Sequence, residues 1–219
     1  TAVAIENVVS WYENDSSDST ILITPKIFPG FYYGFDSNSR ELFSEKIVFE
    51  VNKDKRAIEE GKFVYSSGSK SIPFACESLG SYDFMAWFGK PYIASYDKKN
   101  GFVSGNDERD FISKNVLFPI LRDESLNEKK SFGDKIDLNE DYEICFEKNE
   151  DDVFIILKKD GEVFDKQAET EVYAYKEDIK SVGNVPIILV HSDFDKTGVR
   201  VKGIFQISEK PLYLEEENY

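Results

Sequence analysis

Short runs in which apolar and polar residues alternate dominate the sequence, a pattern typical of β-strands with one buried face. The clearest run is Val199–Ile207, in which every second residue from Val199 is apolar or glycine. Ile187–Val190 is apolar on both faces and predicts a central strand. The predicted strands are Ala2–Trp11, Thr20–Ile23, Phe31–Phe35, Lys46–Val51, Lys62–Ser66, Phe84–Phe88, Tyr92–Tyr96, Val116–Leu121, Tyr142–Lys148, Val153–Lys158, Glu162–Lys166, Val172–Tyr175, Ile187–His191, Val199–Ile207 and Leu212–Leu214.

Turn signals separate these runs. Asp160-Gly161 lies between two alternating segments and predicts a tight hairpin, because glycine accepts a positive φ. Asn149–Asp152 closes the preceding hairpin, and Pro29-Gly30 and Gly183–Pro186 predict further turns. The one helical prediction is Asn106–Ser113, where acidic residues stand near the start of a turn or two of helix.

The polar stretch Arg122–Lys130 separates two strand-rich halves. We therefore predict an all-β protein with at most one or two short helices. Two β-sandwich domains joined by connecting segments are expected, at residues 1–125, with an N-terminal connector strand, and at residues 126–219.

The charge balance argues against two classes of partner. Asp and Glu number 42 against 27 Lys and Arg, which gives a net charge of −15 and a pI near 4.6. Such a surface repels nucleic-acid phosphates and anionic lipid headgroups, and it accumulates cations. We expect no nucleic-acid partner.

The two cysteines, Cys76 and Cys145, lack metal-ligand spacing. They are a candidate disulfide in an exported protein and free thiols in a reducing compartment, and pairing requires Cα atoms within about 7 Å. Alternation places Cys145 on the face of Glu143 and Glu147, so it need not be a core residue.

Catalytic and cofactor motifs do not emerge from the chain, and we predict no catalytic residues, no cofactor and no metal site. His191 is the only histidine, and its position at the end of an apolar run favours a hydrogen-bonded structural role. The acidic clusters Asn14–Asp18 and Asn149–Asp152 could supply oxygen ligands to Ca²⁺, but neither matches an EF-hand loop. Asn14-Asp15-Ser16 is a sequon, so Asn14 is a candidate glycosylation site.

The sequence contains no run of about 18 apolar residues, so we predict no membrane span in it. The chain starts at Thr1 and ends at Tyr219 without a tail, as a segment of a longer polypeptide would. We expect export signals and any membrane anchor to lie outside it.

An ordered series of segments resembles the archaeal S-layer duplication domain of Methanosarcina-type methanogens. The aromatic-rich stretch Phe28–Ile47 is similar to the opening of that domain, and Phe84–Ala94 to its middle. In the second half, the segments that fall in the order of the family are Leu138–Glu143, Leu157–Asp165, Tyr173–Tyr175, Asn184–Ile187 and Lys202–Ser208. The two cysteines are not part of the family pattern, and the family's stretch after the last strand is missing beyond Leu214–Glu217.

The resemblance implies a structural subunit of an extracellular, porous surface lattice, one of several tandem units in a chain. Its partners would be neighbouring subunits and a second repeat. An alternative is a secreted carbohydrate-binding or adhesive β-sandwich module, whose candidate rings are Trp11, Trp87, Tyr32, Tyr33 and Tyr92. A hydrolase with paired carboxylates is a further alternative, for which the sequence singles out no pair.

Overall fold

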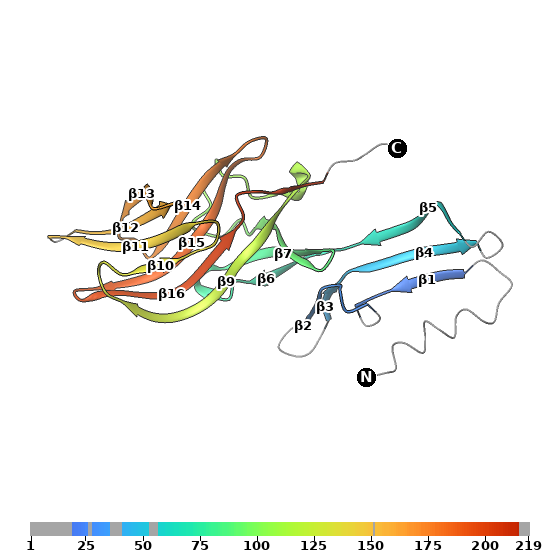
Figure 1. Ribbon diagram of the computed structural model, residues 1–219, viewed down its shortest axis with the longest axis horizontal. Helices are drawn as coiled ribbons and strands as arrows, with labels where there is room; N and C mark the ends of the chain where they lie inside the picture. The colour runs from blue at the N-terminus through green and yellow to red at the C-terminus, as the bar shows by residue number, and fades with distance from the viewer. Residues whose placement is uncertain (1–18, 26–27, 36–40, 53–56, 151, 215–219) are drawn as a thin grey trace. The chain divides into compact units, whose positions relative to one another are not determined.

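The computed structural model describes residues 19–25, 28–35, 41–52, 57–150 and 152–214 (Figure 1). These residues form antiparallel sheets and two single-turn 3₁₀ helices, η2 (Glu77–Leu79) and η3 (Ile112–Lys114). The prediction of an all-β fold is confirmed. The chain separates into two units, one of Thr1–Lys70 with Met85–Pro91 and one of Ser71–Phe84 with Tyr92–Tyr219.

The first unit contains a three-stranded sheet in the order β1-β4-β5 and a two-stranded sheet of β2 and β3. Its strands are β1 (Ser19–Ile23), β2 (Tyr33–Phe35), β3 (Glu41–Ser44), β4 (Lys46–Asn52) and β5 (Ala57–Ser66). Apolar residues pair across all three strands before a register shift between Phe49 and Val51: Ile47 pairs with both Ile23 and Tyr65, and Phe49 with both Ile21 and Phe63. One face of this sheet is therefore apolar across all three strands.

The second unit is built on a large sheet in the order β14-β15-β16-β9-β8-β7-β6, with β17 paired to β9, and on a smaller sheet in the order β10-β11-β12-β13. The strands of the large sheet are β6 (Ser69–Pro73), β7 (Ser81–Trp87), β8 (Lys90–Tyr96), β9 (Val116–Lys130), β14 (Val172–Ile179), β15 (Gly183–Asp195), β16 (Gly198–Ile207) and β17 (Leu212–Tyr213). Those of the small sheet are β10 (Lys135–Asp137), β11 (Tyr142–Asn149), β12 (Asp152–Lys159) and β13 (Glu162–Ala168).

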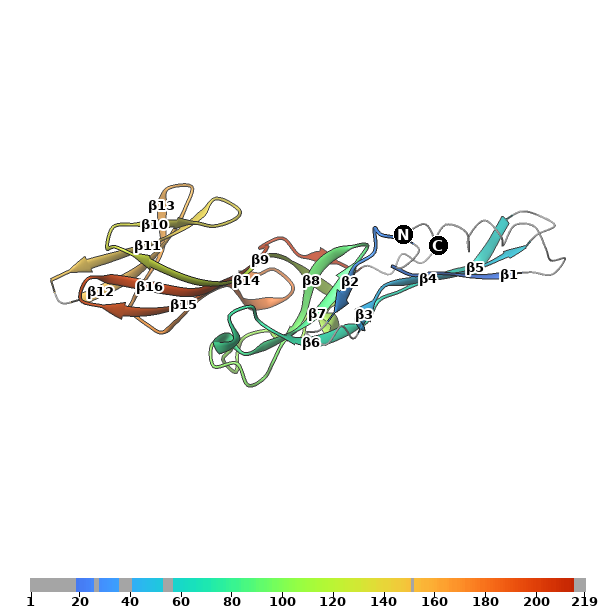
Figure 2. The same cartoon turned by 90° about the horizontal axis from the view of Figure 1, so that it is seen from below.

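The small sheet packs on the large sheet through ring contacts, Tyr142 with Tyr175 at 6.2 Å and Phe146 with Phe194 at 6.3 Å between centroids. Figure 2 shows β10, β11 and β13 on one side of β15 and β16. Gln206 bridges the two layers by accepting from the Asn139 N–H at 2.8 Å and donating to the Asn139 carbonyl at 2.9 Å. Within β15, which lies between β14 and β16, the apolar segment Ile187–Val190 is fully buried, and this confirms the prediction of a central strand there.

Aromatic rings fill the rest of the interior of the second unit. The Phe205 ring lies 4.7 Å from that of Phe74 and 5.1 Å from that of Tyr82, and Phe111 and Phe118 are 4.8 Å apart. All five side chains are at most 2 % exposed. Burial at this level explains the high aromatic content of the sequence, because flat rings fill thin sheet interiors.

The domain boundary expected from the sequence is not where the two units of the structure divide. Arg122–Lys130, read as a separator near residue 125, lies inside β9, where it pairs with β16. The stretch is polar because most of its side chains are half-buried or exposed, and its backbone still completes the sheet. The division between the units instead falls within β6, β7 and β8.

Two local predictions are also corrected. The helix predicted at Asn106–Ser113 is replaced by isolated bridges of Asp107 to Asn184 and of Asp110 to Ser95, with only η3 following. Gly183–Pro186 begins β15, and the turn lies just before it, with Ser181 at a φ of 71°. The hairpin at Asp160-Gly161 is confirmed, with φ values of 52° and 81°. The predicted strand Ala2–Trp11 lies outside the described residues.

No helix in the described part of the chain is long and apolar enough to cross a membrane.

Candidate functional site

The residues singled out from the sequence do not form one site. Asn14 lies outside the described residues. Cys76 and Cys145 are both buried free thiols, so the candidate disulfide is not formed in the structure. Cys145 lies in β11 opposite Ile156, whereas Cys76 precedes η2 and contacts His191, so the two thiols belong to different surroundings.

His191 lies inside β15 rather than at the end of a strand, and it is 3 % exposed. Its Nδ1 lies 2.6 Å from the Ser78 hydroxyl and 3.4 Å from the Cys76 thiol, and its Nε2 lies 3.3 Å from the Glu171 carboxylate. The Glu171 side chain is 76 % exposed, so solvent screens it, unlike the buried carboxylate that orients a catalytic histidine. The geometry supports the prediction of a hydrogen-bonded structural histidine.

Close packing surrounds this cluster. A Cβ atom on Gly203, opposite His191 in the next strand, would lie 2.2 Å from the Cys76 Cβ and 2.7 Å from its sulfur. Gly203 therefore makes room for η2 to pack against the sheet. Sequence alternation alone did not show this role for the glycine in Val199–Ile207.

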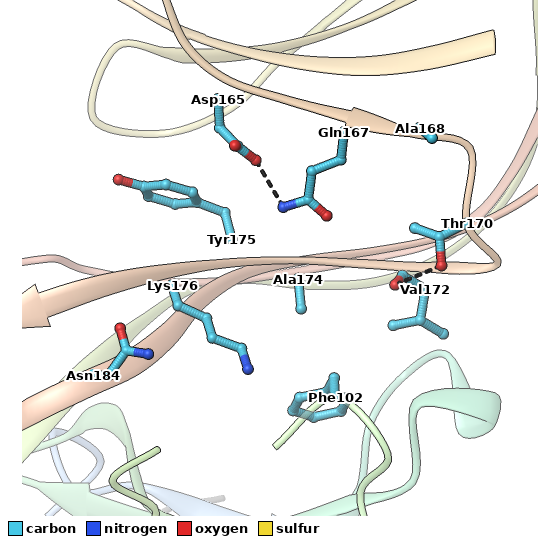
Figure 3. A pocket seen from close by; sticks show the side chains of 10 residues that line it. All are labelled: Phe102, Asp165, Gln167, Ala168, Thr170, Val172, Ala174, Tyr175, Lys176 and Asn184. Carbon is cyan, nitrogen blue, oxygen red and sulfur yellow. Dashed lines mark hydrogen bonds between the residues drawn. The ribbon is translucent and has the colours of Figure 1, made fainter. Parts of the chain in front are cut away.

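An open pocket of about 620 Å³ lies between β13 and β14 in the second unit (Figure 3). Polar groups dominate its wall: Gln167 donates to Asp165 at 2.9 Å, and the Thr170 hydroxyl lies 3.4 Å from the Val172 carbonyl. The lining residues are Phe102, Asp165, Gln167, Ala168, Thr170, Val172, Ala174, Tyr175, Lys176 and Asn184.

The buried carboxylate of Asp107 contacts two of these lining residues, Lys176 and Asn184. Lys176 donates to its Oδ2 at 2.6 Å, and the side-chain amide of Asn184 donates to its Oδ1 at 3.0 Å. The backbone N–H of Ser104 donates to Oδ2 as well, also at 2.6 Å. Burial raises the pKa of Asp107, but the bonds from Lys176 and Ser104 outweigh burial and leave the pKa below its ordinary value.

A second buried carboxylate, that of Glu45, accepts hydrogen bonds from three parts of the first unit. Glu45 is fully buried, and it accepts from the backbone N–H groups of Tyr32 at 2.6 Å and of Gly89 at 3.0 Å and from the Tyr65 hydroxyl. Burial and the bond to Glu45 raise the pKa of Tyr65. Gly89 has a φ of 77°, and its missing Cβ would lie 2.1 Å from the Gly30 carbonyl oxygen. Only glycine fits there.

Apolar side chains are exposed along edge strands. On β13, an edge of the small sheet among the described strands, Val163 is 61 % exposed and Phe164 is 52 % exposed. A register shift opposite Leu157 and Lys158 leaves Phe164 without a partner in the ladder, which explains two consecutive exposed apolar residues. In the first unit, Phe63 and Val64 on β5 are each 52 % exposed.

The rings proposed for sugar stacking have other contacts where the structure describes their side chains. Tyr92 is buried, and Trp87 packs edge-to-face against Tyr65 with ring centroids 5.0 Å apart. Tyr32 is half-buried. Trp11 and the side chain of Tyr33 lie outside what the structure describes.

The acidic segments considered for Ca²⁺ are not brought together as a metal site. Asn14–Asp18 lies outside the described residues, and Asn149 and Asp152 pair with each other across the turn between β11 and β12. Within the described ranges, no group of three or more His, Cys, Asp or Glu side chains could hold a metal ion.

Layered antiparallel sheets, polar clusters satisfied inside the fold and apolar side chains on edge strands define a β-rich protein suited to structural assembly. A family model described as S-layer protein matches residues 12–219, and the chain belongs to this family. A search of the curated proteins gives no match. The family places the protein outside the cell, in a surface lattice with a structural role, and it confirms the resemblance drawn from the sequence.

Proposed function

We propose that the chain is a non-catalytic subunit of an archaeal surface layer and forms a porous, acidic protective sheet around the cell. It would associate with neighbouring subunits and with a second repeat in the same polypeptide, and an anchor outside this segment would attach the sheet to the membrane. The family membership supports the structural role. The observation that carries the proposal beyond the family is the exposed edge strand β13.

An edge strand presents unpaired backbone N–H and C=O groups along one side, and it can template pairing with another chain. Val163 and Phe164 add apolar surface at the same edge. Charged residues flank them, with Glu162 before and Asp165 and Lys166 after. A second copy of the chain would gain backbone pairing, apolar burial and the attraction of opposite charges from one contact.

Burying a valine or phenylalanine side chain contributes about 1.5–3 kcal/mol. More than half of the surface of Val163 and of Phe164 is exposed, so burial in a subunit contact would contribute a large part of this free energy for each side chain. Repetition across a lattice multiplies this modest energy, because each added subunit makes several contacts at once.

The test replaces Val163 with lysine, which places a charge in the contact and leaves the described core of the unit untouched. Val163→Ile is the matched control, since it keeps an apolar, β-branched side chain. We expect electron microscopy of the protein concentrated on a lipid monolayer to show ordered arrays for wild type and Val163→Ile, and fewer or none for Val163→Lys. Equally ordered arrays from wild type and both variants would contradict a role of β13 in the contact between subunits.

The acidic composition supports a second feature of the proposal, a charge filter. A net charge of −15 per chain of 219 residues raises the negative potential around any opening between subunits. The Debye length is about 8 Å at physiological ionic strength, so only openings one or two such lengths wide would stay within this field.

Permeation through reconstituted sheets tests the filter. Cationic and anionic probes of equal size should pass at different rates in low salt, with the cation faster, and at similar rates in high salt. Equal passage at low salt would contradict the filter without bearing on the β13 contact.

A further inference from the structure

The cluster of Lys176, Asp107 and Asn184 joins an amine, a carboxylate and a carboxamide in one place. We propose that it is a self-modification site, at which the Lys176 amine and the Asn184 side chain condense into an intramolecular amide bond. Asp107 would serve as the group that moves the protons. This inference is independent of the proposed lattice function.

Hydrogen bonds to the Asp107 carboxylate bring the amine and the carboxamide together. Asp107 forms a parallel β-bridge with Asn184, and the next residue, Glu108, donates its backbone N–H to the Asn184 carbonyl at 2.9 Å. The Asp107 side chain is 1 % exposed. Its two oxygens face different partners, Oδ2 the amine and Oδ1 the carboxamide, so one carboxylate touches both reacting groups.

The strand register places the two reacting residues on neighbouring strands. In the β14–β15 ladder, Lys176 is opposite Pro186 and Asn184 is opposite Asp178, which makes Lys176 and Asn184 diagonal neighbours. Such neighbours lie within reach of long side chains. Figure 3 shows the two side chains starting at the same end of the pocket.

The reaction balances without an oxidant or a further reagent. The Lys176 ammonium gives one proton to the Asp107 carboxylate, and the free amine attacks Cγ of Asn184. The carboxylic acid protonates the carbonyl oxygen as the tetrahedral intermediate forms. Asp107 then carries a proton from the attacking nitrogen to Nδ2, the Cγ–Nδ2 bond breaks, and ammonia leaves. A lysine and an asparagine become one amide, and the ammonia takes up the remaining proton in water.

Three features of the cluster favour this chemistry. The Lys176 amine donates to Oδ2 of Asp107 at 2.6 Å, so a proton transferred along this one hydrogen bond produces the free amine that reacts. Holding the groups together replaces a collision between separate molecules. The carboxyl group acts as general acid and base from hydrogen-bond distance. A slow reaction suffices, because each chain reacts once, and the open pocket gives ammonia a way out.

The new bond would tie β14 to β15 on both sides of the turn at 180–182. Since β14 is one of the two edges of the large sheet among the described strands, it can peel away from its single neighbour, β15. A covalent link there would hold the edge strand of an extracellular protein in place.

Mass spectrometry of the intact purified protein tests the proposal directly. We expect wild type to weigh less than its sequence by one ammonia molecule. Trypsin should fail to cleave after Lys176, and residues 167–180 should appear joined to residues 181–196 as one branched peptide. Lys176→Arg keeps the positive charge and should restore the full mass, as should Asp107→Asn.

Lys202→Arg is the matched control, since Lys202 contacts Asp193 at the same distance, 2.6 Å, in an exposed ion pair. This variant should keep the mass deficit. Folding of each variant is checked by circular dichroism, so that a loss of structure is not read as a loss of chemistry. A full wild-type mass after prolonged incubation of folded protein overturns the proposal. So does a deficit that persists in Lys176→Arg, because that would place the loss of ammonia elsewhere.

Discussion

Replacing Glu45 with glutamine should weaken the first unit selectively. The carboxylate is fully buried and accepts from the N–H groups of Tyr32 and Gly89 and from the Tyr65 hydroxyl. Glutamine keeps the shape but removes the charge, and it turns one acceptor into a donor that faces N–H groups. Hydrogen bonds to a charged group contribute about 1.5–3 kcal/mol each.

We therefore expect Glu45→Gln to lower the local free energy of unfolding by about 2–4 kcal/mol, one charge-assisted bond lost outright and the others weakened. Backbone hydrogen exchange measures this loss. At a factor of ten for every 1.4 kcal/mol, amides of β4 and of the Gly89 turn should exchange about 30- to 700-fold faster. Strands β15 and β16 of the second unit should exchange at their wild-type rate.

Glu50→Gln is the matched control, because Glu50 forms an ion pair with Lys62 at 2.7 Å with both side chains nearly half exposed. Exposed pairs contribute about 0–1 kcal/mol, so this variant should exchange almost as wild type does. The reasoning about Glu45 is refuted if both variants exchange at the same rate.

Two further predictions concern the second unit. Gly203→Ala should lower the free energy of unfolding, measured in urea, by about 1–3 kcal/mol, because the new methyl group meets Cys76. Adding Cys76→Gly to this variant should restore most of the lost free energy. If the effects of the two substitutions simply add in the double variant, the contact is contradicted. Burial raises the pKa of Glu209, but hydrogen bonds from Lys159 and Tyr142 outweigh burial and keep the pKa below its ordinary value. Glu209 therefore stabilises the fold above the unfolded-state pKa of about 4.3. This contribution is lost as the pH falls through the lower folded-state pKa. In pH-dependent denaturation, Glu209→Gln should thus be less stable than wild type near neutral pH and converge with it in acid; a constant difference at all pH values would contradict this linkage.

Much of the strand pattern could be predicted because alternation is a local property of the chain. Val199–Gly203 alternates since one face meets the core, and Asp160-Gly161 adopts the positive φ values that a tight hairpin needs. The short strands β3, β6 and β10 were not predicted, because their few residues carry little alternation. Polar β9 was read as a linker for a related reason: its long-range pairing with β16 satisfies the backbone without an apolar face.

The candidate sites could not be predicted to the same extent, because their residues are far apart in the sequence. Asp107 and Asn184 are separated by 77 positions, and Cys76 and His191 by 115. The apparent helix at Asn106–Ser113 illustrates the conflict. Its acidic residues suit a helix start, yet bridges to Asn184 and Ser95 hold the segment extended. Tertiary pairing outweighed the weak local preference.

The sequence by itself determined the β-rich class, most strands, the tight hairpin at Asp160-Gly161, the acidic surface and the resemblance to the S-layer family, since each follows from composition or from neighbouring residues. Only the tertiary structure decided the division into units, the burial of Glu45 and Asp107, the exposure of Val163 and Phe164 at an edge, and the need for glycine at positions 89 and 203. Burial and contact depend on which strands become neighbours. That choice is made by long-range sheet pairing, which no short stretch of sequence encodes.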